Sequence, residues 1–513
     1  MNLAQYVFEA GSAYGADRIA VICSGREWSY RHLFDEIEKF AIALVKLGVR
    51  RGDRIMAHMP NRAEYFIAYL GAAKVGAICA TVNIDYTTAE VAHMIRHAEP
   101  KCIVTDDVGA EKIEATVAAT GLKAPPVVRI DDGAPKGHHY RKIAAGLPPV
   151  GFVDVADRDG VLLCYTSGTS GMPKPVLTTH AGEIWAARSF SSMWRLNWAD
   201  KVVVALPLAW VYGLGTVSVP ALSVGATVVL LPRFRPDLVC DAIVRTRGTV
   251  FAGVTTMYRM IVEYAFEQNP RPDLHSLRLA MAGGERRNEA AFDRFEQLSG
   301  IPVHDLYASS EARPILGYDP LTATRPVPGA AGILFPGVEA ELRDDDGKIV
   351  APGEIGELFV RSPNTFREYY REPELTADRV DKDGWVKTGD LFRIDENGYW
   401  HIQGRKQSDM INRSGAKVSP AEVEAHLVKH PMIKEAVVVA RSDPRYGEEV
   451  VACIVGTLPE ADAARLVKEH CKDVLADYKV PTSVILLTDM PYGTTGKIDR
   501  RALGDMANAR AIG

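Results

Sequence analysis

The chain has 513 residues, of which 47% are hydrophobic and 24% charged; this is typical of a globular soluble protein with about two or three domains. The formal net charge is -5, and the sequence has neither an excess of basic residues nor a block of like charges. No nucleic-acid partner is therefore expected. The seven cysteines are dispersed without zinc spacing and the N-terminus lacks a signal-peptide pattern, which together predict a reduced, cytoplasmic protein.

The first 150 residues alternate between helical and strand-like patterns. Amphipathic helical periodicity covers 32–48, 62–76 and 87–98, and short apolar runs such as GDRIMAHM and KCIVTDD separate these segments. Strands that alternate with helices predict a parallel sheet covered by helices.

The middle of the chain repeats this organisation. Amphipathic stretches of helical length lie at 236–246, 257–268 and 288–299. Apolar, strand-like runs occur at 161–165, 202–206, 227–231, 250–254, 277–282 and 303–307. The predicted fold class is therefore α/β, with two parallel-type α/β sheets in a large N-terminal domain.

The segment from Val202 to Pro232 contains no charged residue and is long enough to suggest a membrane span. Pro207, Gly213 and Pro220 interrupt it, however, and its two ends resemble short strands that are apolar on both faces, as in parallel sheets. We therefore predict a buried strand–loop–helix–strand unit and no stable membrane insertion.

The pattern changes after about residue 330. Short strands at 337–344 and 354–361, separated by turn sequences, predict a small β-barrel or antiparallel sheet. From residue 405 onward, the order helix, strand, strand, helix, strand predicts a small, mobile α+β domain. We place the domain boundary so that residues 1–404 form the N-terminal domain and residues 405–513 the C-terminal domain.

A loop with the composition of a triphosphate cradle follows the strand that ends at Tyr165. The segment Tyr165-Thr-Ser-Gly-Thr-Ser-Gly-Met-Pro-Lys174 combines hydroxyl groups, two glycines and a lysine. Glycines let backbone N–H groups approach an anion closely, and the lysine adds positive charge. The loop is not a Walker A motif, because it lacks the Gly-Lys-Ser/Thr tripeptide.

Further motifs follow in order: LPLAWVYG (206–213), YASSE (307–311), KTGD (387–390) and PYGTTGK (491–497). With the loop, they resemble the signatures of the adenylate-forming superfamily, which includes acyl-CoA synthetases, nonribosomal-peptide adenylation domains and firefly-type luciferases. The resemblance spans about residues 10–505. It implies a free-standing acyl-CoA ligase that adenylates a carboxylic acid with ATP and transfers the acyl group to coenzyme A.

The resemblance also implies roles for matched residues. It makes the N-terminal domain an adenylation domain, with the loop over the β- and γ-phosphates and Asp390, supported by Arg405, on the ribose hydroxyls. Glu311 is the implied Mg²⁺ ligand, and Ser310 contacts the α-phosphate. The predicted nucleotide-binding residues are Thr166, Ser167, Gly168, Thr169, Ser170, Gly171, Lys174, Gly283, Gly284, Glu285, Tyr307, Ala308, Ser309, Asp390 and Arg405.

The C-terminal domain is implied to act as a lid that carries the catalytic Lys497. This lysine would reach the substrate carboxylate and the bridging oxygen, where negative charge develops. In the superfamily the lid rotates about a hinge before CoA attacks, so Gln407 or Ser408 is the predicted pivot and Gly415 lines the CoA tunnel. The predicted acyl pocket contains Trp210, Tyr212, Gly213, Thr255 and Arg313.

The motifs depart from the family pattern at several positions. Pro175 and Ala308 replace glycines, and Trp210 stands where many relatives have histidine. Arg313 stands where the family commonly has a small residue. Its guanidinium could bind a second carboxylate of the acid, or it could form an internal salt bridge.

Other functions remain open at this stage. The chain could load a carrier-protein phosphopantetheine instead of CoA, or it could be a catalytically silent nucleotide-binding relative. The motifs do not identify the carboxylic acid: medium acyl, alicyclic and aryl acids all fit. A homodimer is expected from the general preference for two-fold symmetry.

Overall fold

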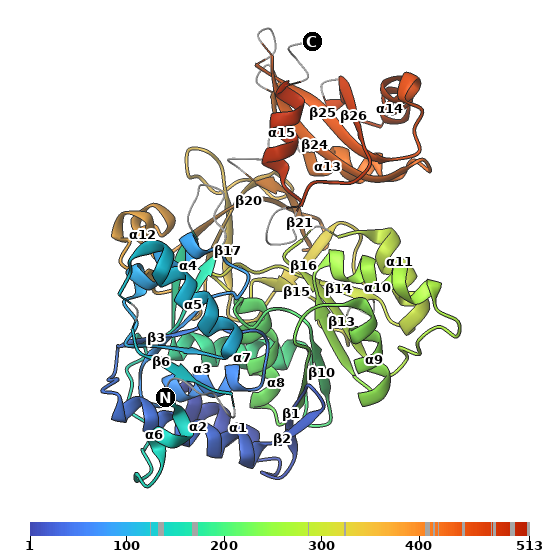
Figure 1. Ribbon diagram of the computed structural model, residues 1–513. Helices are drawn as coiled ribbons and strands as arrows, with labels where there is room; N and C mark the ends of the chain where they lie inside the picture. Colours follow the sequence, from blue (N-terminus) through green and yellow to red (C-terminus); the bar gives the residue numbers. More distant parts are fainter. Residues whose placement is uncertain are drawn as a thin grey trace. The chain divides into compact units, whose positions relative to one another are not determined.

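The computed structural model describes residues 1–123, 125–131, 138–166, 173–285, 287–322, 325–405, 411–413, 416–418, 420–443, 447–472, 474–475, 479–492 and 498–509. The chain divides into two compact units (Figure 1). Unit 1 comprises Met1–Glu339 and Val360–Val386, and unit 2 comprises Ala340–Phe359 and Lys387–Gly513. The boundary at residue 404 stays a prediction.

A seven-stranded sheet forms one half of unit 1, in the order β14-β13-β12-β10-β11-β1-β2. All of its neighbouring strands are parallel except β1 and β2, which form an antiparallel hairpin at the edge. The strands are β1 (Ile19–Cys23), β2 (Arg26–Ser29), β10 (Lys201–Val204), β11 (Thr227–Leu230), β12 (Val250–Gly253), β13 (Leu279–Gly283) and β14 (Val303–Leu306).

Three amphipathic helices cover one face of this sheet (Figure 1). They are α9 (Pro236–Thr246), α10 (Thr255–Glu267) and α11 (Glu289–Ser299). Val239 and Ile243 of α9, Tyr258 of α10 and Phe295 of α11 pack with Phe251 of β12 in one apolar cluster. Every residue of β11, β12 and β13 is buried, so these central strands are covered on both faces, which explains their continuous apolar sequence.

An eight-stranded sheet forms the other half of unit 1, in the order β19-β9-β8-β4-β3-β5-β6-β7. The run from β8 to β7 is parallel, whereas β9 pairs antiparallel with both β8 and β19. The strands are β3 (Arg54–Ala57), β4 (Ile78–Thr81), β5 (Cys102–Thr105), β6 (Val127–Arg129), β7 (His138–His139), β8 (Gly160–Thr166), β9 (Lys174–Thr179) and β19 (Glu368–Tyr369).

Helices from the first 193 residues pack on this second sheet and on one another. The helix α3 is buried along its whole length, and α4 and α5 pack on strands β3, β4 and β8. The helices are α1 (Leu3–Ser12), α2 (Tyr30–Lys46), α3 (Glu64–Lys74), α4 (Thr88–Ala98), α5 (Asp107–Thr120), α6 (Tyr140–Ala144) and α7 (His180–Met193). The predicted pair of parallel-type sheets is therefore confirmed.

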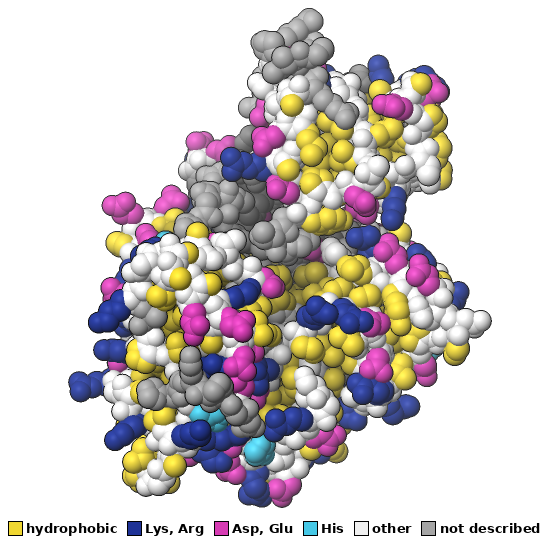
Figure 2. Space-filling view, in the orientation of Figure 1, with side chains coloured by type: hydrophobic (Ala, Val, Ile, Leu, Met, Phe, Trp, Pro, Cys, Tyr) yellow, Lys and Arg dark blue, Asp and Glu magenta, His cyan; other side chains and the backbone are white. Residues whose placement is uncertain are grey.

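The uncharged segment 202–232 is buried within unit 1. It consists of β10, a π-helical segment labelled η1 (Tyr212–Ser218), the short helix α8 (Val219–Ser223) and β11. Its apolar character follows from this burial. Among the described residues, no helix combines the length and the hydrophobicity that a membrane crossing requires. Figure 2 shows basic and acidic side chains interspersed over the face of unit 1 that it displays.

The remaining elements of unit 1 are short. The strands β15 (Leu316–Gly317) and β16 (Ala330–Leu334) pair antiparallel, and α12 (Pro373–Arg379) follows β19. In the region where a small barrel or sheet is expected, four strands lie in the order β21-β20-β18-β17, and most of their residues belong to unit 2. They are β17 (Glu339–Arg343), β18 (Gly356–Arg361), β20 (Val386–Ile394) and β21 (Trp400–Arg405).

The C-terminal part of unit 2 has the predicted α+β order. A long antiparallel hairpin, β24 (Ile433–Asp443) with β25 (Gly447–Gly456), forms its centre, and β26 (Ser483–Leu487) joins β25 in parallel. Apolar clusters cover both faces of the hairpin. The other elements are β22 (Ile411–Arg413), β23 (Ala416–Val418), α13 (Pro420–Leu427), α14 (Ala463–Cys471) and α15 (Arg500–Ala509).

Candidate active site

The predicted phosphate loop connects two paired strands. β8 ends at Thr166 and β9 begins at Lys174, and these two residues are partners in the antiparallel register. Pro175 lacks an N–H group, but its carbonyl oxygen accepts a hydrogen bond from Tyr370 N at 2.8 Å. The hairpin thus fixes both ends of the loop, while Ser167, Gly168, Thr169, Ser170 and Gly171 lie outside the described residues.

A tight turn presents Glu311. Ser309 N donates to Ala312 O at 2.9 Å, and Ala312 N donates to Ser309 Oγ at 3.1 Å. Just outside this turn, Tyr307 and Leu316 exchange backbone hydrogen bonds. The half-buried segment Tyr307–Ser310, which includes Ala308, is therefore held as a closed loop at the end of β14.

The Glu311 carboxylate is largely buried and points at Tyr369. The Tyr369 hydroxyl donates to Glu311 Oε1 at 2.6 Å, and Arg379 Nη2 lies 3.9 Å from the same oxygen. The Lys174 ammonium lies over the Tyr369 ring, 5.7 Å from its centroid. The loop lysine and the candidate metal ligand are therefore brought together around one tyrosine.

A second group of predicted residues lies at the carboxyl ends of β12 and β13. Gly284 has a φ of 80°, which favours glycine, and Glu285 Oε2 accepts a hydrogen bond from Thr256 N at 2.7 Å, at the start of α10. A carboxylate at a helix N-terminus is favourable because the helix dipole is positive there. In open α/β sheets, ligands bind outside these strand ends.

The π-helical segment η1 brings the predicted acyl pocket to the same edge. The Tyr212 hydroxyl donates to Gly253 O at 3.2 Å. A Cβ atom at Gly283 would lie 3.4 Å from that hydroxyl, so the side chain of Tyr212 packs against the end of β13. Gly213 is needed because a Cβ atom there would lie 2.5 Å from Pro207 O. Tyr212, Gly283, Glu285 and the buried Thr255 therefore converge, while Trp210 is half-buried in the turn before η1.

The predicted ribose residues are neighbours in unit 2. Asp390 of β20 is the register partner of Arg405 of β21, and the Asp390 side chain is mostly buried. Thr388 Oγ1 donates to Leu358 O at 2.8 Å and accepts from Asp390 N at 3.1 Å. These bonds order the strand on which the carboxylate is carried.

Arg313 is completely buried and has an internal partner. Its Nη2 atom lies 2.5 Å from Oε1 and 2.6 Å from Oε2 of Glu183 on α7, and Thr178 Oγ1 donates to the same carboxylate at 2.6 Å. Asn364 Nδ2 donates to the Arg313 carbonyl oxygen at 2.9 Å. Of the two interpretations that the sequence left open, the structure contains the internal salt bridge.

Comparison with known proteins identifies the family. The family model described as AMP-binding enzyme matches residues 7–370, and the model for the C-terminal domain of AMP-binding enzymes matches residues 422–497. The chain belongs to the AMP-binding enzyme family. It is an AMP-forming acid–thiol ligase that uses ATP and CoA, so the predicted family and enzyme class are confirmed.

Relatives of this ligase act on different acids. The indoleacetate–CoA ligase of Aromatoleum aromaticum is 32% identical, over 92% of this chain and 92% of that protein. The mitochondrial malonate–CoA ligase ACSF3 of Homo sapiens is 28% identical, over 97% of this chain and 91% of that protein. The solved structure of ATP-bound MatB from Rhodopseudomonas palustris has a TM-score of 0.88 and 29% identity, covering 98% of each chain.

Some predicted residues of the ligase cannot be placed. Lys497, Gly415 and the two hinge candidates, Gln407 and Ser408, lie outside the described residues. The roles assigned to them stay predictions from the resemblance.

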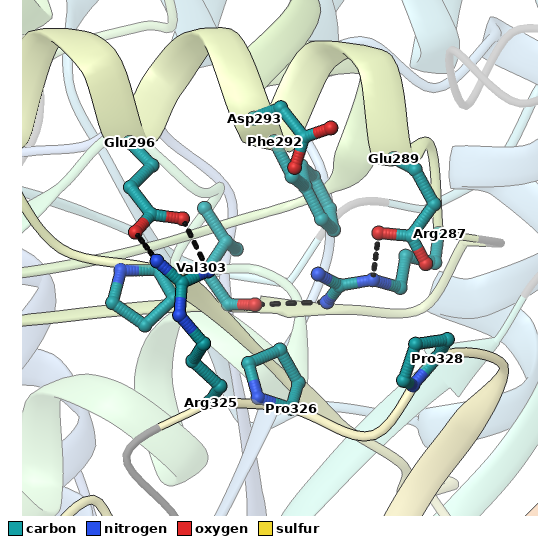
Figure 3. A pocket seen from close by; sticks show the side chains of 10 residues that line it. Arg287, Glu289, Phe292, Asp293, Glu296, Val303, Arg325, Pro326 and Pro328 are labelled. Carbon is teal, nitrogen blue, oxygen red and sulfur yellow. Dashed lines mark hydrogen bonds and ion pairs between the residues drawn. The ribbon is translucent and has the colours of Figure 1, made fainter.

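A cavity of about 280 Å³ lies beside α11 and β14 (Figure 3). Two ion pairs flank it, Arg287 with Glu289 and Arg325 with Glu296. Burial raises the pKa of the nearby Asp305 to about 6, although Arg287, 2.7 Å away, opposes that shift. None of the predicted site residues lines this cavity.

Sequence reasoning missed three residues that surround the ligase's candidate site: Glu183, Tyr369 and Arg379. The isolated charge of Arg313 within the apolar run ARPILGY signals a buried partner. It does not indicate which acidic residue supplies it, because Glu183 lies 130 positions away. Tyr369 and Arg379 carry no such signal.

Proposed function

We propose that this ligase binds ATP with Mg²⁺ in unit 1 and activates a compact carboxylic acid. The observation that carries the proposal is the arrangement around Tyr369, which holds the Glu311 carboxylate and lies under the Lys174 ammonium. One carboxylate together with phosphate oxygens is a donor set that suits Mg²⁺. When bound, the ion would neutralise charge on the triphosphate and on the pyrophosphate that leaves.

Different residues of this chain would bind different phosphates of ATP. Lys174 and the loop before it would orient the β- and γ-phosphates, and Ser310 would contact the α-phosphate. A carboxylate oxygen of the acid then attacks the α-phosphorus, the bond from that phosphorus to the bridging oxygen breaks, and pyrophosphate leaves. Such a displacement needs positioning and charge neutralisation more than proton transfer. In the second step the CoA sulfur attacks the acyl carbon and AMP leaves.

The contacts proposed for the nucleoside follow from the family resemblance. Gly283, Gly284 and Tyr307 would flank the adenine, and Asp390 would accept hydrogen bonds from the ribose hydroxyls. Lys497 would stabilise the charge that develops on the bridging oxygen. The acid would extend from the α-phosphate along η1, past Tyr212.

The buried ion pair supports a compact acid. Gly215 of η1 packs against it, since a Cβ atom there would lie 2.5 Å from Arg313 Nη2 and 3.0 Å from Glu183 Oε2. We expect a long chain that extended past Gly215 to meet this ion pair, whose disruption would be costly because both charges are buried. We therefore expect short aliphatic and small aryl acids to be better substrates than long fatty acids.

The test is pyrophosphate release from ATP and Mg²⁺ over a panel of mono- and dicarboxylic acids of increasing length, with and without CoA. Release that depends on a compact acid and accelerates with CoA is the expected result. A preference for long-chain acids would overturn the proposed size limit, and release that ignores CoA would indicate a carrier protein as acceptor. The homodimer and the cytoplasmic location are separate predictions, which light scattering and cell fractionation would check.

A further inference from the structure

Tyr369 occupies a rigid position beside the proposed phosphate site. It lies on β19, which pairs with β9, and its register partner is Val176, two residues after Lys174. Tyr369 N donates to Thr376 Oγ1 of α12 at 3.0 Å. The residue is 1% exposed, and its ring makes an edge-to-face contact with Phe366 at 4.8 Å between the ring centroids. The backbone of Tyr369 is thus fixed by the sheet and by α12, and its buried ring packs against Phe366.

The hydroxyl of Tyr369 restrains one oxygen of Glu311. It donates to Oε1 at 2.6 Å, and Arg379 Nη2 approaches the same oxygen at 3.9 Å. The backbone of Glu311 is tied to the same segment, because Phe366 N donates to Glu311 O at 2.7 Å. Because the protein engages Oε1, we expect Oε2 to be the oxygen that binds a ligand.

The Tyr369 hydroxyl is a suitable partner for a metal ligand, because it donates its proton to the Glu311 carboxylate. A donor of this kind fixes the orientation of a metal-binding carboxylate without removing its charge.

The ring of Tyr369 restrains the lysine of the loop. The Lys174 ammonium lies 5.7 Å from the ring centroid, within the distance at which a cation is attracted to an aromatic face. Lys174 follows the glycine-rich loop directly, so its side chain would otherwise have wide rotational freedom. Glu311 and Lys174, the two side chains proposed to act on the phosphates, thus both contact Tyr369.

We propose that Tyr369 is a positioning residue for adenylation: its hydroxyl aims Glu311 at the metal–phosphate group and its ring aims Lys174 at the outer phosphates. This inference rests on the proposed function of the Glu311 site. It assigns no contact between Tyr369 and the acid or CoA, so it predicts that the first half-reaction depends on Tyr369 and the second does not.

The experiment compares Tyr369→Phe, Tyr369→Leu and a control, Tyr370→Phe. The control removes the hydroxyl of the adjacent tyrosine, whose ring faces Arg54 and Arg371 instead of the site. The measurements on each full-length variant are Mn²⁺ binding by EPR in the presence of a non-hydrolysable ATP analogue, acid-dependent pyrophosphate exchange, thioester formation from a supplied acyl-adenylate, and the thermal midpoint.

For Tyr369→Phe we expect Mn²⁺ affinity and pyrophosphate exchange to fall by about 10- to 100-fold, the usual effect of losing a hydrogen bond to a metal ligand. Thioester formation from the adenylate and the thermal midpoint should match the control. Tyr369→Leu should in addition raise the ATP requirement, and this extra effect should vanish in a Lys174→Ala background. Because Tyr369→Phe keeps the ring, this variant tests the role of the hydroxyl separately from that of the ring.

Unchanged Mn²⁺ binding and exchange in Tyr369→Phe would overturn the inference, as would an equal loss of both half-reactions. The proposed function fails in a different way. In that case the wild-type protein itself would release no pyrophosphate with any acid and would bind no Mn²⁺ with the nucleotide analogue.

Discussion

Arg313 and Glu183 form a completely buried ion pair, with Arg313 Nη2 2.5 Å from Glu183 Oε1 and 2.6 Å from Oε2. The pair joins the loop after Glu311 to α7, and Gly215 of η1 packs against it. Neither charge contacts solvent, so each depends on the other.

Removing one partner of this pair should therefore destabilise the folded protein. We expect Arg313→Met to lower the free energy of unfolding by about 3–5 kcal/mol, because Glu183 is left as an uncompensated buried charge. The double variant Arg313→Met with Glu183→Leu should recover most of that loss. Urea denaturation of both single variants and the double variant measures the coupling; strictly additive losses would show that the two side chains act independently.

Substituting Lys497 should separate the two half-reactions. Lys497→Ala is expected to abolish adenylate formation and to spare thioester formation from a supplied acyl-adenylate, because only the first step develops charge on the bridging oxygen. Single-turnover measurements of each step give the comparison. Equal failure of both steps in a folded variant would contradict the role assigned to this lysine.

Asp390→Ala should raise the ATP concentration needed for half-maximal rate, since the ribose hydroxyls would lose their acceptor. A loss of about 1–3 kcal/mol, or about 5- to 150-fold in the KM for ATP, is expected for a hydrogen-bonded carboxylate. Asp395→Asn is the matched control, because Asp395 lies in the turn after β20 and bonds to His401 at 2.8 Å. An unchanged KM for ATP in Asp390→Ala would count against the ribose contact.

Glu36 should contribute to acid sensitivity. Burial alone would raise its pKa, but hydrogen bonds from Lys39, Tyr140 and Arg141 outweigh burial and lower the pKa to about 2. A lowered carboxyl pKa gives stability that is present above the unfolded-state value and is lost as the pH falls through the folded-state value. Glu36→Gln should therefore lower the free energy of unfolding at neutral pH. The free energy of unfolding of this variant should also decrease less than that of the wild type between about pH 4.5 and 2. Unfolding titrations across that range measure this difference, and parallel curves for the two proteins would refute it.

The regular elements were predictable because burial imposes a pattern on them. The apolar run 227–231 became β11, and the amphipathic stretch 236–246 became α9 with the same bounds. A strand covered on both faces must be apolar throughout, and a helix on a sheet must be apolar on one side. Such local patterns can be seen without knowing what lies opposite.

Contacts between distant segments left no comparable pattern. The π-helical segment η1 is closely packed at Gly213 and Gly215, where a Cβ atom would not fit. Two glycines in the sequence allow such packing but do not predict a π-helix. Tyr369 meets Glu311 only because β19 joins the edge of the sheet at β9. The motif residues themselves were found by resemblance, and the side chains that hold them were not.

All seven cysteines are free and buried. Burial raises the pKa of Cys471 to about 11 and that of Cys102 to about 12, so these sulfurs stay protonated as well as covered. An enzyme that passes a reactive acyl group to an external thiol thus keeps its own thiols out of reach of that electrophile. A colorimetric thiol reagent added to the folded enzyme would therefore react with coenzyme A alone. The decrease in its colour during the reaction would measure the consumption of coenzyme A, without a background signal from the enzyme.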